Sequence, residues 1–259
     1  MLNRLAMPGV VASGLYVFTA ALTKDFSVRL DKEKNVCIGK LIVFRRAHNF
    51  ARLIIFMSLE RKVRAVERLF RQTDDDLQRF RAESGLQCKI GCGACCTKPD
   101  IHATVLEFLP FAYQCFREGC AEQMLEVLRN NHTSFCALFR LTTVDSQAGN
   151  CSAYQYRGLI CRLFGFSAYR DKYGKPTLVT CRTIKETAPV QYEQTVQRIA
   201  CGNLQPPLIS CYYMRLSQID PTLGTEQYPI NVAITEALET VLHYYSYRRP
   251  PGSSKKKVA

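Results

Sequence analysis

The residues of this chain best suited to chemistry are four cysteines in one short stretch, Cys88-Lys-Ile-Gly-Cys92-Gly-Ala-Cys95-Cys96. Cysteine thiolates are soft metal ligands, and turns of two or three residues let successive sulfurs converge on one centre. Glycine at positions 91 and 93 permits the backbone conformations that such a loop needs and leaves amides free to point at sulfur. Hydrophobic packing gives no reason for four thiols in a glycine-containing loop. The stretch therefore predicts a site for a metal ion or a metal cluster.

Disulfides are the main alternative for these thiols, and the whole-chain count argues against them. The sequence holds 13 cysteines among 259 residues, which is sparse for a disulfide-stapled secreted domain and odd in number. The adjacent Cys95 and Cys96 cannot bond to each other without strain. We therefore expect a reducing compartment and a cytoplasmic protein.

Four later cysteines extend the candidate ligand set. Cys136 and Cys181 stand alone, whereas the other two bracket Cys151-Ser-Ala-Tyr-Gln-Tyr-Arg-Gly-Leu-Ile-Cys161. The full set of expected metal ligands is Cys88, Cys92, Cys95, Cys96, Cys136, Cys151, Cys161 and Cys181. One tetrahedral zinc or one four-iron cluster needs about four thiolates, so eight could serve two sites or one polynuclear site.

Two further expectations follow from this donor set. Adjacent cysteines are expected to point their side chains apart, which favours two centres. Several thiolates on one centre would be strongly anionic, and among nearby Lys89, Lys98, Arg157 and Arg162 we select Arg162 as the cofactor-binding residue, although an ordinary salt bridge explains an arginine equally well. His102 is expected to be hydrogen-bonded or solvated and not a ligand. The few histidines favour an iron–sulfur cluster slightly over Zn²⁺.

The combined spacing resembles a known pattern. The first three cysteines alone have the C-x3-C-x2-C spacing of radical S-adenosylmethionine enzymes, but the chain lacks the alternating strands and helices of their barrel. The adjacent pair together with the later Cys-x9-Cys-Arg resembles the YkgJ-type cysteine-cluster family of bacterial proteins. This resemblance implies a zinc- or iron-chelating domain, sometimes with an iron–sulfur cluster, and no defined reaction. Gly158 departs from the family, which often has proline there.

Charge is concentrated at the two ends of the chain. The net charge is +13, yet residues 57–247 hold 21 Lys or Arg and 19 Asp or Glu. A nearly neutral body lacks the basic face that nucleic acid binding requires, so we expect no nucleic acid partner. The apolar run at residues 8–22 is too short to span a membrane comfortably, so we expect no membrane partner. The Lys255–Lys257 run could contact RNA or anionic lipid, but the preceding Pro, Gly and Ser favour a disordered basic tail over residues 250–259.

The start of the folded domain is expected at Met57. Ser58 fits a helix N-cap, and residues 1–56 lack clear periodicity and differ in charge balance. We interpret residues 1–56 as an extension outside the domain, which would comprise residues 57–249.

Helices are expected to position the thiols. A 3.6-residue periodicity predicts a helix from Ser58 to Ser84, ended by Gly85. A capping box at Thr104–Glu107 opens a helix to Gly119, which Pro110 should kink or divide. Further helices are predicted at residues 122–128, 189–199, 208–219 and from Pro229 onward. A hairpin is predicted from runs 164–170 and 177–182, with Cys181 on its second strand.

The predicted fold is therefore mainly α with a small β-hairpin, its helices packed around the cysteine-rich loops. The predicted function is that of a metal-binding protein, holding zinc or an iron–sulfur cluster, with no physiological role assigned. The alternative is an oxidoreductase or other enzyme that uses an iron–sulfur cluster as a redox or Lewis-acid centre. Catalytic residues, any protein partner and the oligomeric state stay open, because the sequence has no phosphate loop, dinucleotide fingerprint or catalytic triad pattern.

Overall fold

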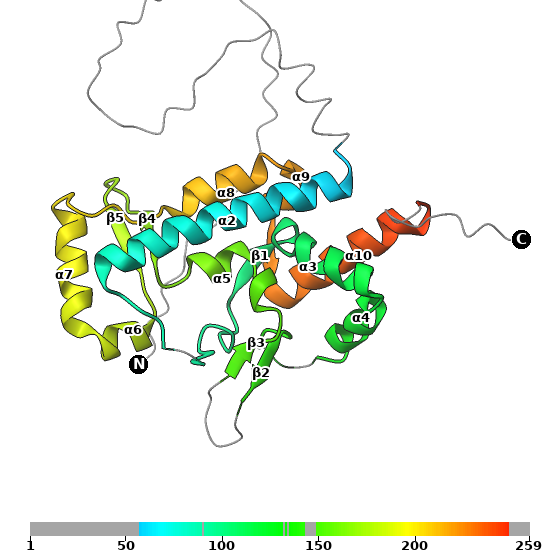
Figure 1. Cartoon of the computed structure of the whole chain (residues 1–259), viewed down its shortest axis with the longest axis horizontal. Helices are drawn as coiled ribbons and strands as arrows, with labels where there is room; N and C mark the ends of the chain where they lie inside the picture. Colours follow the sequence, from blue (N-terminus) through cyan, green and yellow to red (C-terminus); the bar gives the residue numbers. More distant parts are fainter. Residues whose placement is uncertain (1–56, 90, 132, 134, 143–148, 249–259) are drawn as a thin grey trace, which may run out of the picture. The chain divides into compact units, whose positions relative to one another are not determined.

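A computed structural model describes residues 57–89, 91–131, 133, 135–142 and 149–248. The expected extension over residues 1–56 and the expected tail over residues 250–259 lie outside this part of the chain. The described part is mainly helical and has three small antiparallel sheets of two strands each (Figure 1). This confirms the predicted fold class.

The helices among the described residues are α2 (Leu59–Ser84), α3 (Val105–Glu118), α4 (Ala121–Arg129), α5 (Leu159–Leu163), α6 (Arg182–Thr187), α7 (Pro189–Ala200), α8 (Ile209–Ser217), α9 (Pro221–Gly224) and α10 (Ile230–Ser246). A short 3-10 helix covers Tyr154–Tyr156. The strands are β1 (His102–Thr104), β2 (Phe139–Leu141), β3 (Gly149–Cys151), β4 (Ser167–Arg170), β5 (Pro176–Val179) and β6 (Gln227–Pro229).

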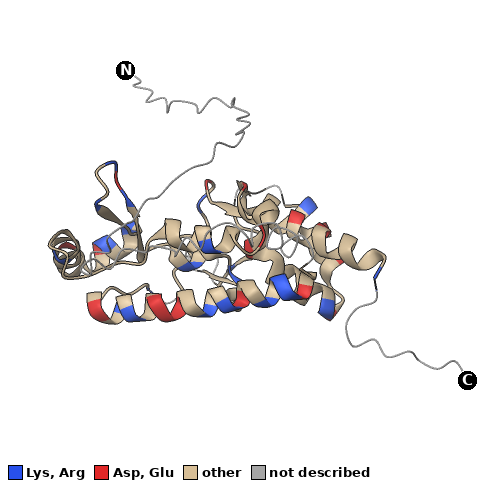
Figure 2. Cartoon of the chain, turned by 90° about the horizontal axis from the view of Figure 1, so that it is seen from above, with Lys and Arg blue, Asp and Glu red and all other residues tan. Residues whose placement is uncertain are grey.

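Helix α2 begins and ends where its sequence predicts. The Ser58 side chain accepts a hydrogen bond from the Arg61 amide, and Gly85 adopts the left-handed conformation that closes the last turn. The helix packs along α3 and α8 and reaches α7 (Figure 1). Lys and Arg alternate with Asp and Glu along its length (Figure 2).

Helix α3 packs most extensively against α10. Its N-terminus has the predicted capping contact, because the Thr104 amide donates to Glu107 Oε1 at 2.9 Å. Of the two predicted effects of Pro110, a kink or a division of the helix, the division is wrong, since α3 continues through Pro110. Pro110 lies in the second turn and is buried, so the helix gives up one backbone hydrogen bond while the proline ring packs in the core.

Two hydrophobic cores lie along α2. The first contains the N-terminal half of α2, through Phe70, together with the inward faces of α3, α4 and α10. The second contains Leu77 and Phe80 from the C-terminal half of α2, with residues from β5, α6 and α7. The cysteine-rich segments contact both cores, as described below.

The strand pairs differ from the single predicted hairpin. Strands β4 and β5 form that hairpin, with Ser167 opposite Val179. Strand β1 pairs with the distant β6, and β2 pairs with β3, and neither pairing was predicted. The prediction that Cys181 lies on a strand is also wrong. Pairing ends at Val179, and Cys181 is the N-cap of α6, where its sulfur accepts a hydrogen bond from the Ile184 amide at 3.4 Å.

None of the helices among the described residues is long and apolar enough to cross a membrane.

Candidate metal centre

The cysteine loop is shaped by two tight turns. The Cys92 amide donates to the Lys89 carbonyl at 3.3 Å, and the Cys96 amide donates to the Gly93 carbonyl at 2.8 Å. Gly91 and Gly93 both have positive φ angles, of 70° and 60°. Residues with side chains rarely adopt this conformation, so the glycines allow the turns that bring the four thiols into one short loop.

This loop is docked on the β2–β3 pair. The Gly149 amide donates to the Gly91 carbonyl at 3.0 Å, and the Cys136 amide donates to the Cys96 carbonyl at 3.0 Å. A Cβ atom on Gly93 would lie 2.5 Å from Phe139 Cε2 and 2.9 Å from the Gly149 carbonyl oxygen, so no side chain fits there. The docking sets the loop against Cys136, which precedes β2.

Cys151 is placed by the same strand pair. It is the last residue of β3 and lies opposite Phe139 of β2. Cys136, Cys151 and the cysteine loop are therefore held together by backbone hydrogen bonds.

Cys161 is positioned by the buried carboxylate of Glu107. Glu107 is fully buried and accepts hydrogen bonds from the Thr104 amide and, at 2.8 Å, from the Ile160 amide. The second bond fixes the first turn of α5, in which Cys161 lies. Burial raises the pKa of the Glu107 carboxyl, and the two amides act in the opposite direction.

Gly158 lies beside the same carboxylate. A Cβ atom there would come within 3.0 Å of Glu107 Oε2 and of Phe108 Cζ. The departure from the resembled pattern at this position thus has a local reason, because glycine leaves room for Glu107.

The eight candidate thiols form one electrostatic neighbourhood. Burial raises the pKa of Cys88, and the thiols of Cys92, Cys181 and Cys95 raise it further. Burial also raises the pKa of Cys161 well above its ordinary value, with further contributions from the other thiols, namely Cys136, Cys95 and Cys151, and from Glu107. Cys96 interacts with Cys95, Cys136 and Cys161. Thiols from four separate segments therefore lie close enough to influence one another.

Cys95 and Cys96 are in direct contact, contrary to the expectation that adjacent side chains point apart. The Cys96 thiol and the Cys95 sulfur share a hydrogen bond, which lowers the pKa of Cys95 to about 6 and raises that of Cys96. The two residues lie in a turn and not in an extended strand. Successive side chains are on opposite sides of a strand but can converge in a turn. The argument from this pair for two separate centres is therefore lost.

Backbone amides point at several of the sulfurs. Cys136 accepts from the amides of Leu138 and Phe139, although burial dominates and raises its pKa to about 11. Cys151 accepts from the Ala153 amide, and Cys181 accepts from the Ile184 amide. Such hydrogen bonds to sulfur stabilise thiolates and tune metal–sulfur clusters.

The donor set is chemically suited to a soft metal, because it consists of thiols. The sulfur atoms, however, are too far apart to coordinate one ion without moving closer together. All the cysteines within the described ranges are free thiols. No three His, Cys, Asp or Glu side chains in those ranges are close enough to hold an ion as they stand. Cys88 and Cys95 are exposed and Cys92 and Cys96 are half-buried. Rotation of the loop thiols toward the more buried Cys136 and Cys161 is the movement that coordination requires.

Arg162 serves the scaffold in this structure. Its guanidinium is ion-paired with Asp74 of α2, donates to the carbonyls of Arg157 and Gln155, and stacks 4.4 Å from the Phe70 ring centroid. Its side chain is only 4% exposed. The arginine selected from sequence thus ties the Cys151–Cys161 segment to α2.

Arg157 is one of several arginines whose charge acts on the thiols, since Arg81 acts on Cys88 and Arg162 interacts with Cys161. Burial raises the pKa of Cys151, and the Ala153 amide and the positive charge of Arg157 oppose this rise. Arg157 also contributes to the lowered pKa of Cys95, after the larger effect of Cys96. It is held by Asp74 Oδ1 at 3.2 Å and by stacking on Tyr154.

Two buried polar groups near Cys161 were not anticipated. Glu107 was predicted only as part of a capping box, and Tyr213 was not among the candidate residues. The Tyr213 hydroxyl is buried beside the Glu107 carboxylate, which raises its pKa after the larger effect of burial, but makes no hydrogen bond of ordinary geometry. No sequence signal marks Tyr213, because it approaches Glu107 only through the packing of α8 near α3 and α5.

His102, Cys115 and Cys120 have local partners of their own. His102 Nδ1 is 3.1 Å from the Asp100 carbonyl oxygen, in keeping with the expectation that it is hydrogen-bonded. Cys115 and Cys120 interact with each other at the junction of α3 and α4.

Comparison of the chain with models of protein families, with curated proteins and with solved structures gave no match. The argument for function therefore rests on the chain's own residues.

Proposed function

We propose that this protein binds metal through its clustered cysteines, as an iron–sulfur cluster or, as the second choice, as Zn²⁺. The observation that carries the proposal is the convergence of thiols from four segments, with backbone amides donating to their sulfurs. The proposed ligands are drawn from Cys88, Cys92, Cys95, Cys96, Cys136, Cys151, Cys161 and Cys181.

The energetics of the thiols support a bound cation. Burial raises the pKa of Cys161 and the neighbouring thiols raise it further, so the surroundings of this thiol disfavour its thiolate form. A cation reverses this balance, because coordinated thiols lose their protons and the like charges share a positive centre. The amides at Cys136, Cys151 and Cys181 stabilise the same deprotonated state.

The preference for iron–sulfur rests on the donors present. The neighbourhood is all thiol, and the nearest histidine in sequence, His102, is engaged with a backbone carbonyl. More than four thiols that influence one another electrostatically suit a polynuclear cluster, for which an all-sulfur shell is usual. When bound, such a cluster would supply electron transfer or a Lewis-acidic iron. A reducing compartment such as the cytoplasm is proposed for the same reason, since free thiols must persist there.

The test is anaerobic purification followed by metal and sulfide analysis and a visible spectrum. Iron with acid-labile sulfide and a brown chromophore is the expected result. A colourless protein with stoichiometric zinc would keep the metal site and overturn the choice of iron–sulfur. Protein that retains neither metal, with its thiols paired as disulfides, would overturn the proposal.

A further inference from the structure

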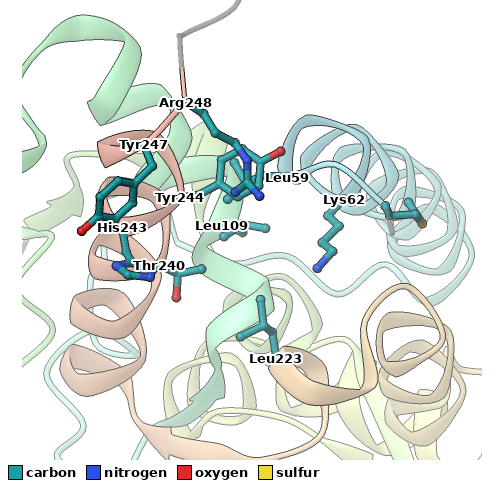
Figure 3. A pocket seen from close by; sticks show the side chains of 10 residues that line it. Leu59, Lys62, Leu109, Leu223, Thr240, His243, Tyr244, Tyr247 and Arg248 are labelled. Atoms are coloured by element: carbon teal, nitrogen blue, oxygen red, sulfur yellow. The ribbon is translucent and has the colours of Figure 1, made fainter. Parts of the chain in front are cut away.

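A cavity separate from the cysteine loops lies between the first turn of α2 and the last turns of α10. Its volume is about 570 Å³, within the usual range for small-molecule sites. Figure 3 shows the side chains of Lys62 from α2, Leu109 from α3 and Leu223 from α9 around the same space. No candidate thiol lines it.

One side of the cavity is apolar. The half-buried Met57 and Leu223 supply its accessible apolar surface, because Leu59 and Leu109 behind them are 3% and 0% exposed. The half-buried ring of Tyr244 extends this lining at the end of α10, whereas Tyr247 is 86% exposed. An apolar body of a ligand would gain free energy by leaving water for this surface.

The polar groups around the cavity are basic. Lys62, His243 and Arg248 line it, and no Asp or Glu of the described chain does so. Lys62 Nζ is already paired with Asp220 Oδ2 at 2.6 Å. Arg248 stacks 4.1 Å from the Tyr244 ring centroid and, among the described residues, has no carboxylate within ion-pair distance.

The charged side chains that line the cavity determine which ligand charge would be complementary. With Lys62 neutralised by Asp220, one guanidinium remains to be paired, which suits a single negative charge. A guanidinium binds a carboxylate through two parallel hydrogen bonds. We propose that this cavity binds a small amphipathic carboxylate, an apolar acid whose body lies on Met57, Leu223 and Tyr244 and whose head group is bound by Arg248.

The test uses decanoate as the probe, titrated into the full-length, metal-loaded protein by calorimetry at low ionic strength. Saturable binding is expected for decanoate and much weaker binding for decanol, which has the same chain without the charge. Absence of saturable decanoate binding, or equal binding of the two probes, would overturn the proposal.

Two variants with a matched control locate the site. Arg248→Gln should weaken decanoate binding about tenfold, the effect of losing one charge-assisted hydrogen bond. Arg64→Gln removes the same charge from an exposed position of α2 outside the cavity and should leave binding unchanged.

Thr240→Trp should fill the cavity and abolish binding while the helical circular dichroism is retained. Equal effects of the two arginine changes, or undiminished binding by Thr240→Trp, would place the ligand elsewhere and contradict the proposal. Because none of these changes touches a thiol, failure here leaves the metal proposal intact.

Discussion

The contact between Cys95 and Cys96 is the residue-scale feature that most constrains the metal centre. Their sulfurs share a hydrogen bond, and both thiols interact electrostatically with Cys136. Both sulfurs are therefore placed to serve one shared centre.

Replacing either of these cysteines by alanine should remove metal to a similar extent. We expect Cys95→Ala and Cys96→Ala each to lose nearly all of the bound metal, because each change removes one of about four ligands of a single centre. The measurement is metal per chain after anaerobic desalting, with the exposed Cys201→Ala as the control. Loss of about half of the metal in each variant would indicate two separate centres, and full retention in one variant would show that its cysteine is not a ligand.

Glu107 gives a residue-scale prediction with a defined pH dependence. Because burial raises its pKa, the folded chain holds this proton at pH values where the unfolded chain has released it. Its contribution to the free energy of unfolding should therefore fall as the pH rises from the ordinary glutamate pKa through the raised one.

The measurement compares the wild type with Glu107→Gln by urea denaturation from mildly acidic to neutral pH. The substitution should remove this pH-dependent loss. It should also lower stability by about 1–3 kcal/mol at the acidic end, because an amide NH₂ would face the Ile160 or the Thr104 amide. Glu122→Gln, at an exposed position of α4, is the control. Parallel stability curves for wild type and Glu107→Gln would contradict the assignment.

At the scale of elements, the docking of the cysteine loop on β2–β3 decides whether the thiols meet. Gly91 and Gly93 have similar positive φ angles, but a Cβ atom has open space at Gly91 and would overlap Phe139 and Gly149 at Gly93. A substitution at Gly91 would therefore introduce only backbone strain, whereas a substitution at Gly93 would introduce backbone strain and a steric overlap.

Gly93→Ala should therefore undock the loop, whereas Gly91→Ala should not. Both changes place a side chain at a positive φ angle, which costs about 1 kcal/mol. Gly93→Ala adds the overlap with Phe139 and Gly149 of the β2–β3 pair. We expect Gly93→Ala to lose most of the metal and Gly91→Ala to keep it, measured as metal per chain and as melting temperature. Equal losses would show that strain, and not docking, controls the site.

The sequence predicts the elements with strong local signals and misses those that depend on distant partners. Ser58, Gly85 and the Thr104–Glu107 pair mark helix ends through contacts within one turn, and these predictions are confirmed. The pairing of β1 with β6 joins segments more than a hundred residues apart, and no local pattern specifies it.

In the candidate site, too, features set by local sequence were predicted and features set by tertiary packing were missed. Thiol spacing identifies the donors, since the chemistry of cysteine is local, and the ligand set itself stays a prediction. The contact of Arg162 with Asp74 and the approach of Tyr213 to Glu107 arise only from tertiary packing. The directions of the Cys95 and Cys96 side chains depend on the conformation of the turn that contains them, and the sequence did not predict that conformation.

At the scale of the whole molecule, the thiols lie where two hydrophobic cores adjoin. Cys136 belongs to the first core, and Cys96, Cys151 and Cys161 pack against it, whereas Cys181 packs against the second. A centre that uses ligands from both groups would link the cores at a second place besides α2.

Metal removal should therefore loosen the second core more than the first. Helices α3 and α10 pack extensively against each other, so their helical content should persist after chelation. Hydrogen exchange of metal-loaded and chelated protein should show the largest loss of protection in α6 and α7. Uniform loss across α3 and α10 as well would contradict a metal that links two otherwise independent cores.

X-ray absorption at the metal edge, on protein purified without oxygen, tests the thiolate centre most directly. The predicted result is a first shell made of sulfur alone, at about 2.3 Å whether the metal is iron or zinc. A first shell dominated by nitrogen or oxygen would contradict coordination by the clustered cysteines.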